Sequence, residues 1–302
     1  MTLQKTITSR AWGELFILSL IWGGSFLAFS LALRELGVFT TVAFRIAGGA
    51  VVLWIYIWIR KLPIPKSPKV WGAFLMMGLL NNVVPFSLIA WAQLRIPSGL
   101  ASILNASTAI IGVLIAAILF SDERLTIRKT VGISLGFFGV STSIGMSALS
   151  DFNLASLSQL AILGSSLSYA LAGAWAKSAM KDLPPQVSAA GMTTCASLLI
   201  IPLALFFDGF PTFSYGPATW AAIIYSAIFA TAFAYLLYYR ILDMAGSGNL
   251  MLVTLTVAPV AILLGALVLG ESLRAQDYLG FILLAAGLLV LDGRLLALLR
   301  NK

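Results

Sequence analysis

Two adjacent amides and a proline, Asn81, Asn82 and Pro85, lie within a run that is otherwise almost wholly apolar, from about Val70 to Ala90. An amide or hydroxyl that makes no hydrogen bond in hydrocarbon costs several kcal/mol. The two amides are therefore expected to face protein, water or a polar ligand, where they could recognise a small molecule by hydrogen bonding. In a simpler interpretation, Asn81 only satisfies the broken turn, because Pro85 frees the carbonyl four residues before it.

Other apolar runs carry polar or aromatic side chains at a similar depth. Trp22 and Ser25 are three residues apart and so share one face of a helix. Aromatic rings beside a few placed polar groups are typical of small-molecule sites. The predicted substrate-binding residues are Trp22, Ser25, Asn81, Asn82, Asn105, Tyr169, Trp175 and Tyr235.

Several of these side chains have a structural role as the alternative. Serine in a membrane helix often bonds back to its own helix, Trp175 could belong to the interfacial aromatic belt, and Asn105 could clamp two helices together. Arg45 also has two interpretations, because it lies about two turns inside its run. It either snorkels outward or faces the interior and meets a substrate carboxylate.

No carboxylate falls in the middle of an apolar run, and Glu14, Glu123, Asp243, Glu271, Asp277 and Asp292 lie at the ends of these runs or between them. Proton-driven transporters commonly use acidic or histidine relays buried in the membrane. If the chain carries a substrate across a membrane, the sequence therefore favours facilitated, gradient-driven movement, and a net-neutral substrate over a permanently cationic one. The alternative is coupling through a group near the membrane face, such as Glu14.

Catalytic and metal chemistry lack their usual residues. The chain has no histidine and a single cysteine, Cys195, which removes the commonest general base and metal ligand and any disulfide within the chain. No G-x-S-x-G motif and no pair of deep carboxylates is found. We therefore predict a protein that is not an enzyme, without catalytic residues, metal or cofactor. A structural membrane scaffold is a further alternative.

The elements that must position the candidate residues are membrane-spanning helices. Of the 302 residues, 60% are hydrophobic and only 10% are charged, too few to cover a water-facing surface. A span needs roughly 20 apolar residues, and the first run is too long for a signal peptide. The predicted fold class is all-α integral membrane with ten transmembrane helices, at about 11–33, 38–60, 70–91, 97–120, 127–147, 157–180, 186–207, 217–240, 248–270 and 276–294.

Lysine and arginine fix the predicted orientation. With the N-terminus in the cytoplasm, fifteen of these residues fall on the cytoplasmic side and only four, Arg34, Arg45, Arg95 and Arg274, on the opposite side. Both termini are therefore predicted to be cytoplasmic. The net charge of +8 then reflects orientation and anionic lipid headgroups of the bilayer, not binding of nucleic acid.

The chain contains an internal repeat with a constant offset of 148 positions. The matched pairs are Thr108 and Thr256, Glu123 and Glu271, Leu125 and Leu273, Gly132 and Gly280, and Gly139 and Gly287. Five spans in each half is an odd number, so the second half must enter the membrane from the opposite side. The predicted domains are residues 1–150 and 151–302, two inverted five-helix repeats, which typify secondary transporters with a midplane site between the halves.

The repeated residues have expected roles of their own. Glu123 and Glu271 precede helices closely, where a carboxylate favours the positive N-terminus, so we expect them to cap a helix or to have another structural role. The small residues of the fifth and tenth spans allow close helix packing. We expect these two spans to form a scaffold or the interface of a homodimer.

Several motifs of this sequence resemble those of a known family. Trp22-Gly23-Gly24-Ser25-Phe26, Phe44-Arg45 and the two Glu-x-Leu blocks with their glycines are similar to the EamA-type transporters of the drug/metabolite transporter superfamily. Within it the chain resembles bacterial exporters of amino acids, aromatic ones in particular. One departure is that the ninth span has Pro259, whereas the fourth has Ile111 at the matching position.

This resemblance implies a carrier in the bacterial inner membrane that exports small neutral or zwitterionic metabolites, hydrophobic or aromatic amino acids above all. The expected mechanism is alternating access around a midplane cavity. The alternative is a multidrug or nucleoside-type metabolite exporter, with proton coupling as an option. The candidate bending points are Gly23, Gly24, Pro85, Gly248 and Pro259. Asn82→Ala is expected to leave the protein folded but to alter transport or selectivity.

Overall fold

The computed structural model describes residues 8–120, 125–144, 154–180, 183–245 and 253–292. Within these ranges every regular element is a helix and no strand is present, as predicted for an all-α protein. Gly248, a predicted bending point, and Glu123, a predicted cap, lie outside the described residues.

The first half of the chain follows the predicted spans closely, but two of its spans are divided. The third span contains a π-helical segment, η1, and the fourth is interrupted after Asn105. The elements in order are α1 (Ser9–Ala32), α2 (Val38–Arg60), α3 (Pro68–Gly78), η1 (Leu79–Val83), α4 (Val84–Gln93), α5 (Ser98–Asn105), α6 (Thr108–Leu119) and α7 (Ile127–Ile144).

The second half also has divided spans, and π-helical segments, η2 and η3, occur in the eighth and ninth. The elements in order are α9 (Leu154–Ala179), α10 (Pro185–Phe207), α11 (Pro217–Ile224), η2 (Tyr225–Phe233), α12 (Ala234–Ala245), α14 (Val253–Leu264), η3 (Gly265–Leu269) and α15 (Ala275–Asp292). Proline opens three helices of the chain, at Pro68, Pro185 and Pro217, where its missing N–H costs nothing.

Most of these helices can cross a membrane. In the part of the chain that the structure describes, seven helices are long and apolar enough to do so, and two shorter apolar helices cover Thr256–Leu269 and Ala275–Val290. The seven cover the first four and the sixth to eighth predicted spans. The chain is therefore a multi-pass membrane protein, and the full count of ten stays a prediction.

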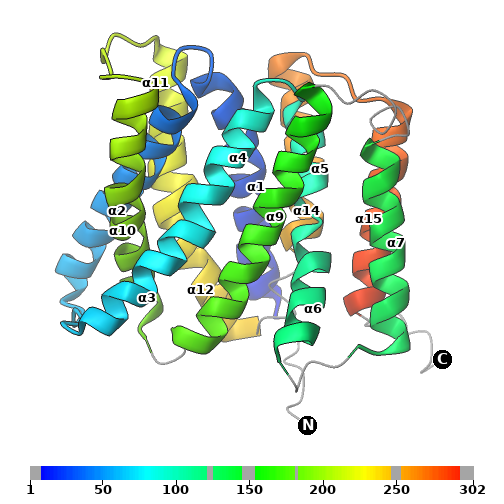
Figure 1. The fold of residues 1–302 in the computed structure, drawn as a ribbon, viewed down its shortest axis with the longest axis horizontal. Coiled ribbons are helices and arrows are strands. Elements are labelled where there is room, and N and C mark those ends of the chain that lie inside the picture. The colour runs from blue at the N-terminus through cyan, green and yellow to red at the C-terminus, as the bar shows by residue number, and fades with distance from the viewer. Residues whose placement is uncertain (1–7, 121–124, 145–153, 181–182, 246–252, 293–302) are drawn as a thin grey trace.

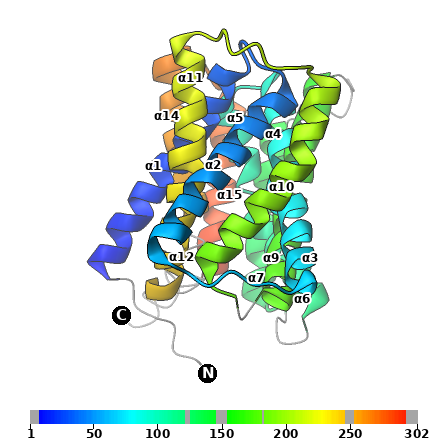
Figure 2. The same ribbon diagram turned by 90° about the vertical axis from the view of Figure 1, so that its left-hand side faces the viewer.

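The packing of the helices follows the match between the two halves. When each helix is replaced by its counterpart in the other half, a packed pair becomes another packed pair or itself. α7 packs along α15, and α2 lies between α10 and η2 (Figure 2). α1 packs on α14, as α9 packs on α6, which belongs to the span matched to α14 by the 148-residue offset. Figure 1 shows α1 and α7 running upward and their counterparts, α9 and α15, running downward.

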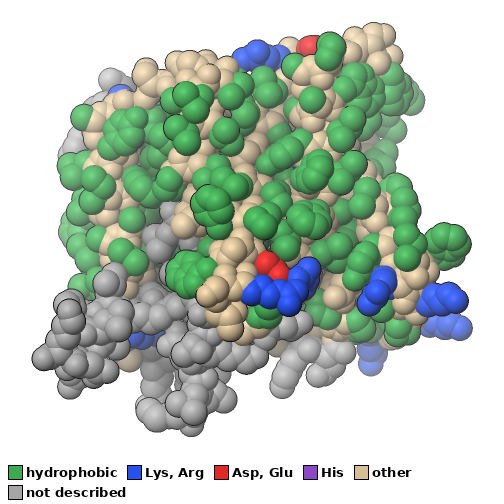
Figure 3. Space-filling view, turned by 180° about the vertical axis from the view of Figure 1, so that it is seen from behind, with side chains coloured by type: hydrophobic (Ala, Val, Ile, Leu, Met, Phe, Trp, Pro, Cys, Tyr) green, Lys and Arg blue, Asp and Glu red, His purple; other side chains and the backbone are tan. Residues whose placement is uncertain are grey.

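The charged side chains gather at the ends of the bundle, whereas hydrophobic side chains cover its middle. In Figure 3 lysine and arginine side chains collect along the lower edge of one face, with hydrophobic side chains above them. α1 begins and α15 ends at this same lower end (Figure 1). The distribution is that of a protein embedded in a bilayer, with one end more basic than the other.

Acidic side chains near the ends of the bundle cap helices that are distant in sequence. Glu271 accepts hydrogen bonds from the backbone N–H groups of Ser98 and Gly99, at 2.9 and 3.2 Å, and so caps α5. Glu271 therefore has the expected capping role, but at α5 and not at the helix that follows it in the sequence. Asp208 caps α2 in the same way through Thr40, because the unpaired N–H groups at a helix start attract any carboxylate within reach.

Candidate binding site at the centre of the bundle

Three predicted residues meet directly in the middle of the bundle. The side-chain amide nitrogen of Asn81 donates to the hydroxyl of Tyr235 over 3.1 Å, and that hydroxyl donates to Oδ1 of Asn82 over 3.0 Å. The two asparagines lie on η1 and the tyrosine on α12, so the network joins the two halves of the chain. Asn82 is 0% exposed, and its Nδ2 finds no acceptor within the described residues.

Arg45 of α2 also faces the interior, and it is 4% exposed. Its Nε donates to the hydroxyl of Thr231 over 3.2 Å, and Nη2 donates to the carbonyl of Ala230 over 3.4 Å. The guanidinium lies 4.0 Å from the ring centroid of Phe86 and 4.9 Å from that of Phe29. Cation–π contacts and hydrogen bonds of this kind fix its position in the bundle.

Tyr169 of α9 completes the site. Its ring packs edge-on against that of Phe86, with centroids 6.4 Å apart. Phe86 in turn lies against the guanidinium of Arg45, so that the ring of Tyr169 borders the same region. We refer to Arg45, Asn81, Asn82, Tyr169 and Tyr235 as the central cluster. It combines one fixed cation, neutral hydrogen-bonding groups and aromatic rings, which suits recognition of a small polar molecule rather than catalysis.

The π-helical segments supply the backbone of this site. Proline at position 85 cannot donate, and the carbonyl of Leu80, five residues earlier, instead accepts a 2.7 Å hydrogen bond from the hydroxyl of Ser168 on α9. The sequence predicts that Pro85 frees the carbonyl four residues back, at Asn81. In a π turn the hydrogen bonds reach five residues back, so the carbonyl without a backbone donor is that of Leu80. In η2 the hydroxyl of Thr231 donates to the carbonyl of Ser226 over 2.9 Å, which holds the oxygen that Arg45 contacts.

The other predicted substrate-binding residues make contacts outside the central cluster. Trp22 packs against Tyr238, with ring centroids 5.9 Å apart. The hydroxyl of Ser25 donates to the carbonyl of Trp22 in its own helix, and Trp175 donates to the carbonyl of Ala73 over 3.2 Å, which ties α9 to α3. Asn105 ends α5, and its Oδ1 has no hydrogen-bond donor among the described residues. Their part in binding stays a prediction.

The predicted bending points differ in their surroundings. α1 runs through Gly23 and Gly24 as regular helix, and both glycines allow close packing: a side chain at Gly23 would collide with Val260, and one at Gly24 with Tyr225. Pro85 follows the π turn of η1, whereas Pro259 lies inside α14. Motion at these points stays a prediction.

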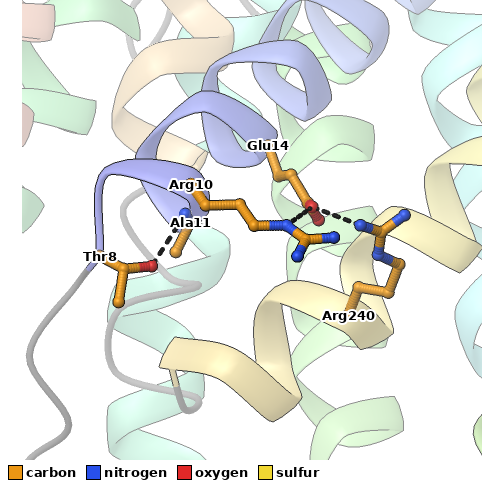
Figure 4. Close-up of polar contacts among 5 residues, drawn as sticks. All are labelled: Thr8, Arg10, Ala11, Glu14 and Arg240. Atoms are coloured by element: carbon orange, nitrogen blue, oxygen red, sulfur yellow. Dashed lines mark hydrogen bonds and ion pairs between the residues drawn. The ribbon is translucent and has the colours of Figure 1, made fainter.

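A second polar cluster lies at the basic end of the bundle (Figure 4). Oε1 of Glu14 on α1 accepts from Arg240 on α12 over 2.6 Å and from Arg10 over 3.3 Å. The side chain of Glu14 is 11% exposed. This carboxylate therefore joins α1 to α12 near the membrane face, as its place near the end of the first apolar run predicts.

Two hollows lie away from the central cluster. One of about 650 Å³ is lined by Trp54, Trp58, Lys61 and their neighbours at the end of α2. A smaller one of about 170 Å³ lies between the start of α2 and the end of α10. Within the described residues, no group of three or more histidine, cysteine or acidic side chains is arranged to hold a metal ion.

Three residues that shape the centre are missing from the sequence-based list of substrate-binding residues: Arg45, Phe86 and Thr231. Arg45 had a usable signal, because a charged residue inside an apolar run is itself an indication of function. Phe86 had none, since one more aromatic residue in a hydrophobic run is indistinguishable from lipid-facing or core residues.

A known protein family and several known proteins match this chain over most of its length. The model of the "EamA-like transporter family" matches residues 11–145 and 156–291, once in each half. The "Uncharacterized transporter YoaV" of Bacillus subtilis is 21% identical over 272 residues, covering 89% of this chain and 92% of the relative. A "Probable amino-acid metabolite efflux pump" of Escherichia coli is 26% identical over 292 residues, covering 93% and 95%.

The fold also matches a solved structure. A crystal structure aligns with a TM-score of 0.68 at 19% sequence identity, covering 93% of this chain and 97% of that chain. At this identity the likeness establishes the arrangement of helices alone.

Proposed function

The chain belongs to the EamA-like transporter family, and from this premise we propose that it exports small neutral or zwitterionic metabolites, hydrophobic or aromatic amino acids above all. The export would cross the bacterial inner membrane, with both termini in the cytoplasm. Relatives such as YoaV of Bacillus subtilis are named transporters, and two relatives are named probable amino-acid metabolite efflux pumps. A transporter rather than an enzyme is the class that these relatives support.

The observation that carries the proposal is the central cluster. It lies in the middle of the bundle, it draws side chains from both halves, and apart from Arg45 its hydrogen-bonding groups are neutral. Substrate sites of secondary transporters lie between the halves at this depth. Amides, tyrosine hydroxyls and aromatic rings suit a molecule with an apolar side chain and a polar head.

The proposed architecture is ten spans in two inverted repeats that move by alternating access. The exchangeable packing pairs and the opposite directions of α1 and α9 support it. So does the occurrence of π-helical segments at matched positions, because η1 shifted by 148 residues falls within η2. Irregular helices of this kind are common at transporter binding sites and can absorb bending.

The proposed energetics is facilitated movement down the substrate's own gradient. Within the described residues, the acidic side chains that make hydrogen bonds lie at the ends of helices: Glu14, Glu35, Asp208, Glu271 and Asp277. Each is held by backbone N–H groups or arginines. An arrangement of this kind stabilises the fold, and in the described part of the chain it puts none of these carboxylates at the centre as a proton carrier.

The proposal is tested with purified protein in proteoliposomes loaded with unlabelled phenylalanine or leucine. Labelled amino acid outside is expected to exchange inward without any imposed pH gradient, and protein-free liposomes serve as the control. Lack of exchange for every neutral amino acid, with exchange of a nucleoside or a cationic drug in the same liposomes, would replace the amino-acid proposal by the metabolite or multidrug alternative.

A further inference from the structure

Arg45 places a formal positive charge inside the bundle without an acidic partner. Its side chain is 4% exposed, and within the described residues no carboxylate lies in ion-pair range of it. A cation withdrawn from water is costly unless other groups compensate it, and ionisable residues inside membranes mark substrate pathways. Thr231, Ala230 and two aromatic rings compensate this charge in part but do not neutralise it.

We propose that Arg45 binds the carboxylate of the transported molecule, so that the substrates are amphipathic monocarboxylates, amino acids included. The inference rests on the proposed function and names the group by which the same site holds its cargo. A guanidinium matches the two oxygens of a carboxylate with paired N–H donors. It has more donors than the two hydrogen bonds made here use.

The contacts of Arg45 restrict how a ligand can meet its guanidinium. The hydrogen bonds to η2 fix the orientation of the guanidinium, and the rings of Phe29 and Phe86 contact it. A carboxylate therefore approaches the edge of the group, where its N–H donors point. Phe86 also packs against Tyr169, which gives an apolar side chain of the ligand an aromatic wall beside the charge.

A second donor lies within the same cluster. Nδ2 of Asn82 has no acceptor in the described residues, and Oδ1 of that amide is already occupied by Tyr235. A buried donor without a partner costs free energy, which a ligand oxygen would recover. Arg45 and Asn82 thus both offer N–H groups, and both suit the carboxylate end of a ligand.

A purely structural role for Arg45 makes a different prediction. If the guanidinium only ties α2 to η2, then removing it weakens the fold but changes nothing in the choice of ligand. The carboxylate role requires that the protein prefer an acid over its neutral amide, and that this preference depend on Arg45.

The decisive experiment compares 3-phenylpropionate with 3-phenylpropionamide, which have nearly the same shape but differ in charge. Binding to the full-length purified protein is measured by calorimetry and by thermal unfolding. The acid is expected to bind at least about tenfold more tightly than the amide, since one charge-assisted pair is lost with the amide. Equal affinity of the two compounds for the unmodified protein would overturn the inference.

Three variants locate the effect. Arg45→Gln is expected to abolish the preference for the acid, and Arg45→Lys to keep a weaker preference, because it retains charge without the paired donors. Arg95→Gln is the matched control, since Arg95 also lies over an aromatic ring, that of Trp91, but is exposed at the end of the bundle. A preference that persists in Arg45→Gln overturns the inference. If Arg45→Gln does not fold, the preference for the acid is compared between Arg45→Lys and the unmodified protein. An equal preference in these two proteins would then overturn the inference.

A transport arm separates this inference from the proposed function. Proteoliposomes are tested for exchange of phenylalanine and of phenylalaninamide. Exchange of both at equal rates would leave amino-acid transport standing and overturn the role of Arg45. Exchange of neither would overturn the proposed function, and the binding comparison of acid and amide would still decide whether Arg45 holds a carboxylate.

Discussion

Tyr235 joins the two asparagines of the central cluster, because its single hydroxyl serves both. Tyr235→Phe would leave two amides in the bundle without this partner, and each loses a hydrogen bond. We expect the free energy of unfolding to fall by about 1–3 kcal/mol and transport to slow, measured by thermal unfolding and by exchange in proteoliposomes. Tyr56→Phe, on α2 and away from the cluster, is the control. An unchanged stability would show that water replaces the hydroxyl.

Asn82 and Ser25 make opposite predictions, although the sequence places both in the substrate site. Asn82 has an amide nitrogen without a partner, whereas the hydroxyl of Ser25 is satisfied within its own helix. Asn82→Ala is expected to keep the protein folded and to shift the relative rates for different amino acids. Ser25→Ala should keep rates within about twofold. Competition between labelled and unlabelled amino acids measures both, and the reverse ranking would move the site toward α1.

The residue scale also shows what a sequence can reveal about a membrane site. The polarity of Asn81, Asn82 and Tyr235 was sufficient to predict that they face polar partners, because an unpaired polar group in hydrocarbon is costly, and they bond to one another. The direction of Arg45 could not be deduced, since a helix rotated by part of a turn would carry the same residue to lipid, to the interface or to the centre. That rotation is set by packing against η2, where Gly49 faces Thr231.

At the scale of elements, the spans were predictable and their irregularities were not. The bounds of α2 agree with the predicted limits of 38–60, because charge, glycine and hydrophobic length define them. The π segments were missed, since Pro85 indicates a lost hydrogen bond but not the register that replaces it. The backbone of η1 and η2 is alike although their side chains differ, so the likeness is hidden from sequence comparison.

The η1 segment makes its own prediction through the bond from Ser168 to the carbonyl of Leu80. Ser168→Ala should cost about 1 kcal/mol of stability. In Pro85→Ala the new N–H gives this region of η1 a donor of its own, so Ser168→Ala should then cost less. A double-mutant cycle by thermal unfolding measures the coupling. Additive costs would show that the proline and the serine act independently.

The glycines of α7 and α15 let these two helices of one chain pack closely against each other. A side chain at Gly139 would collide with the backbone at Gly280 and Leu284, and one at Gly287 with the backbone at Gly132 and Gly136. The scaffold role expected for the fifth and tenth spans therefore has a physical basis in close backbone packing. The homodimer stays a prediction, and it would have to use other faces of these helices, such as those carrying Phe137 and Phe138, which are exposed.

At the scale of the whole molecule, Glu14 tests how transport is driven. Its pair with Arg240 joins α1 to α12 at the membrane face, and Arg240 is half-exposed there. Glu14→Gln should therefore lower stability by no more than about 1 kcal/mol. Without a pH gradient, the exchange rate of Glu14→Gln should stay within about twofold of the rate of the unmodified protein. Accumulation against a gradient that appears only with an imposed pH difference and vanishes in Glu14→Gln would establish proton coupling instead.

The inverted arrangement proposed for the two halves predicts which loops lie on the same side of the membrane. Lys66 precedes the third span at the basic end, and Arg95 follows that span at the other end. In the second half, Lys177 lies near the end of α9 and Ser214 lies beyond α10. Inverted repeats with cytoplasmic termini require Lys66 and Lys177 inside and Arg95 and Ser214 outside.

Single cysteines at these four positions can be placed in a Cys195→Ala chain, because Cys195 is the only cysteine and is buried. A membrane-impermeant maleimide should label Arg95→Cys and Ser214→Cys in intact cells, and Lys66→Cys and Lys177→Cys only in inside-out vesicles. The Cys195→Ala chain without added cysteine is the control for background labelling. Labelling of Lys66→Cys and Ser214→Cys from the same side would contradict the inverted arrangement, because the described helices place these two positions at opposite ends of the bundle.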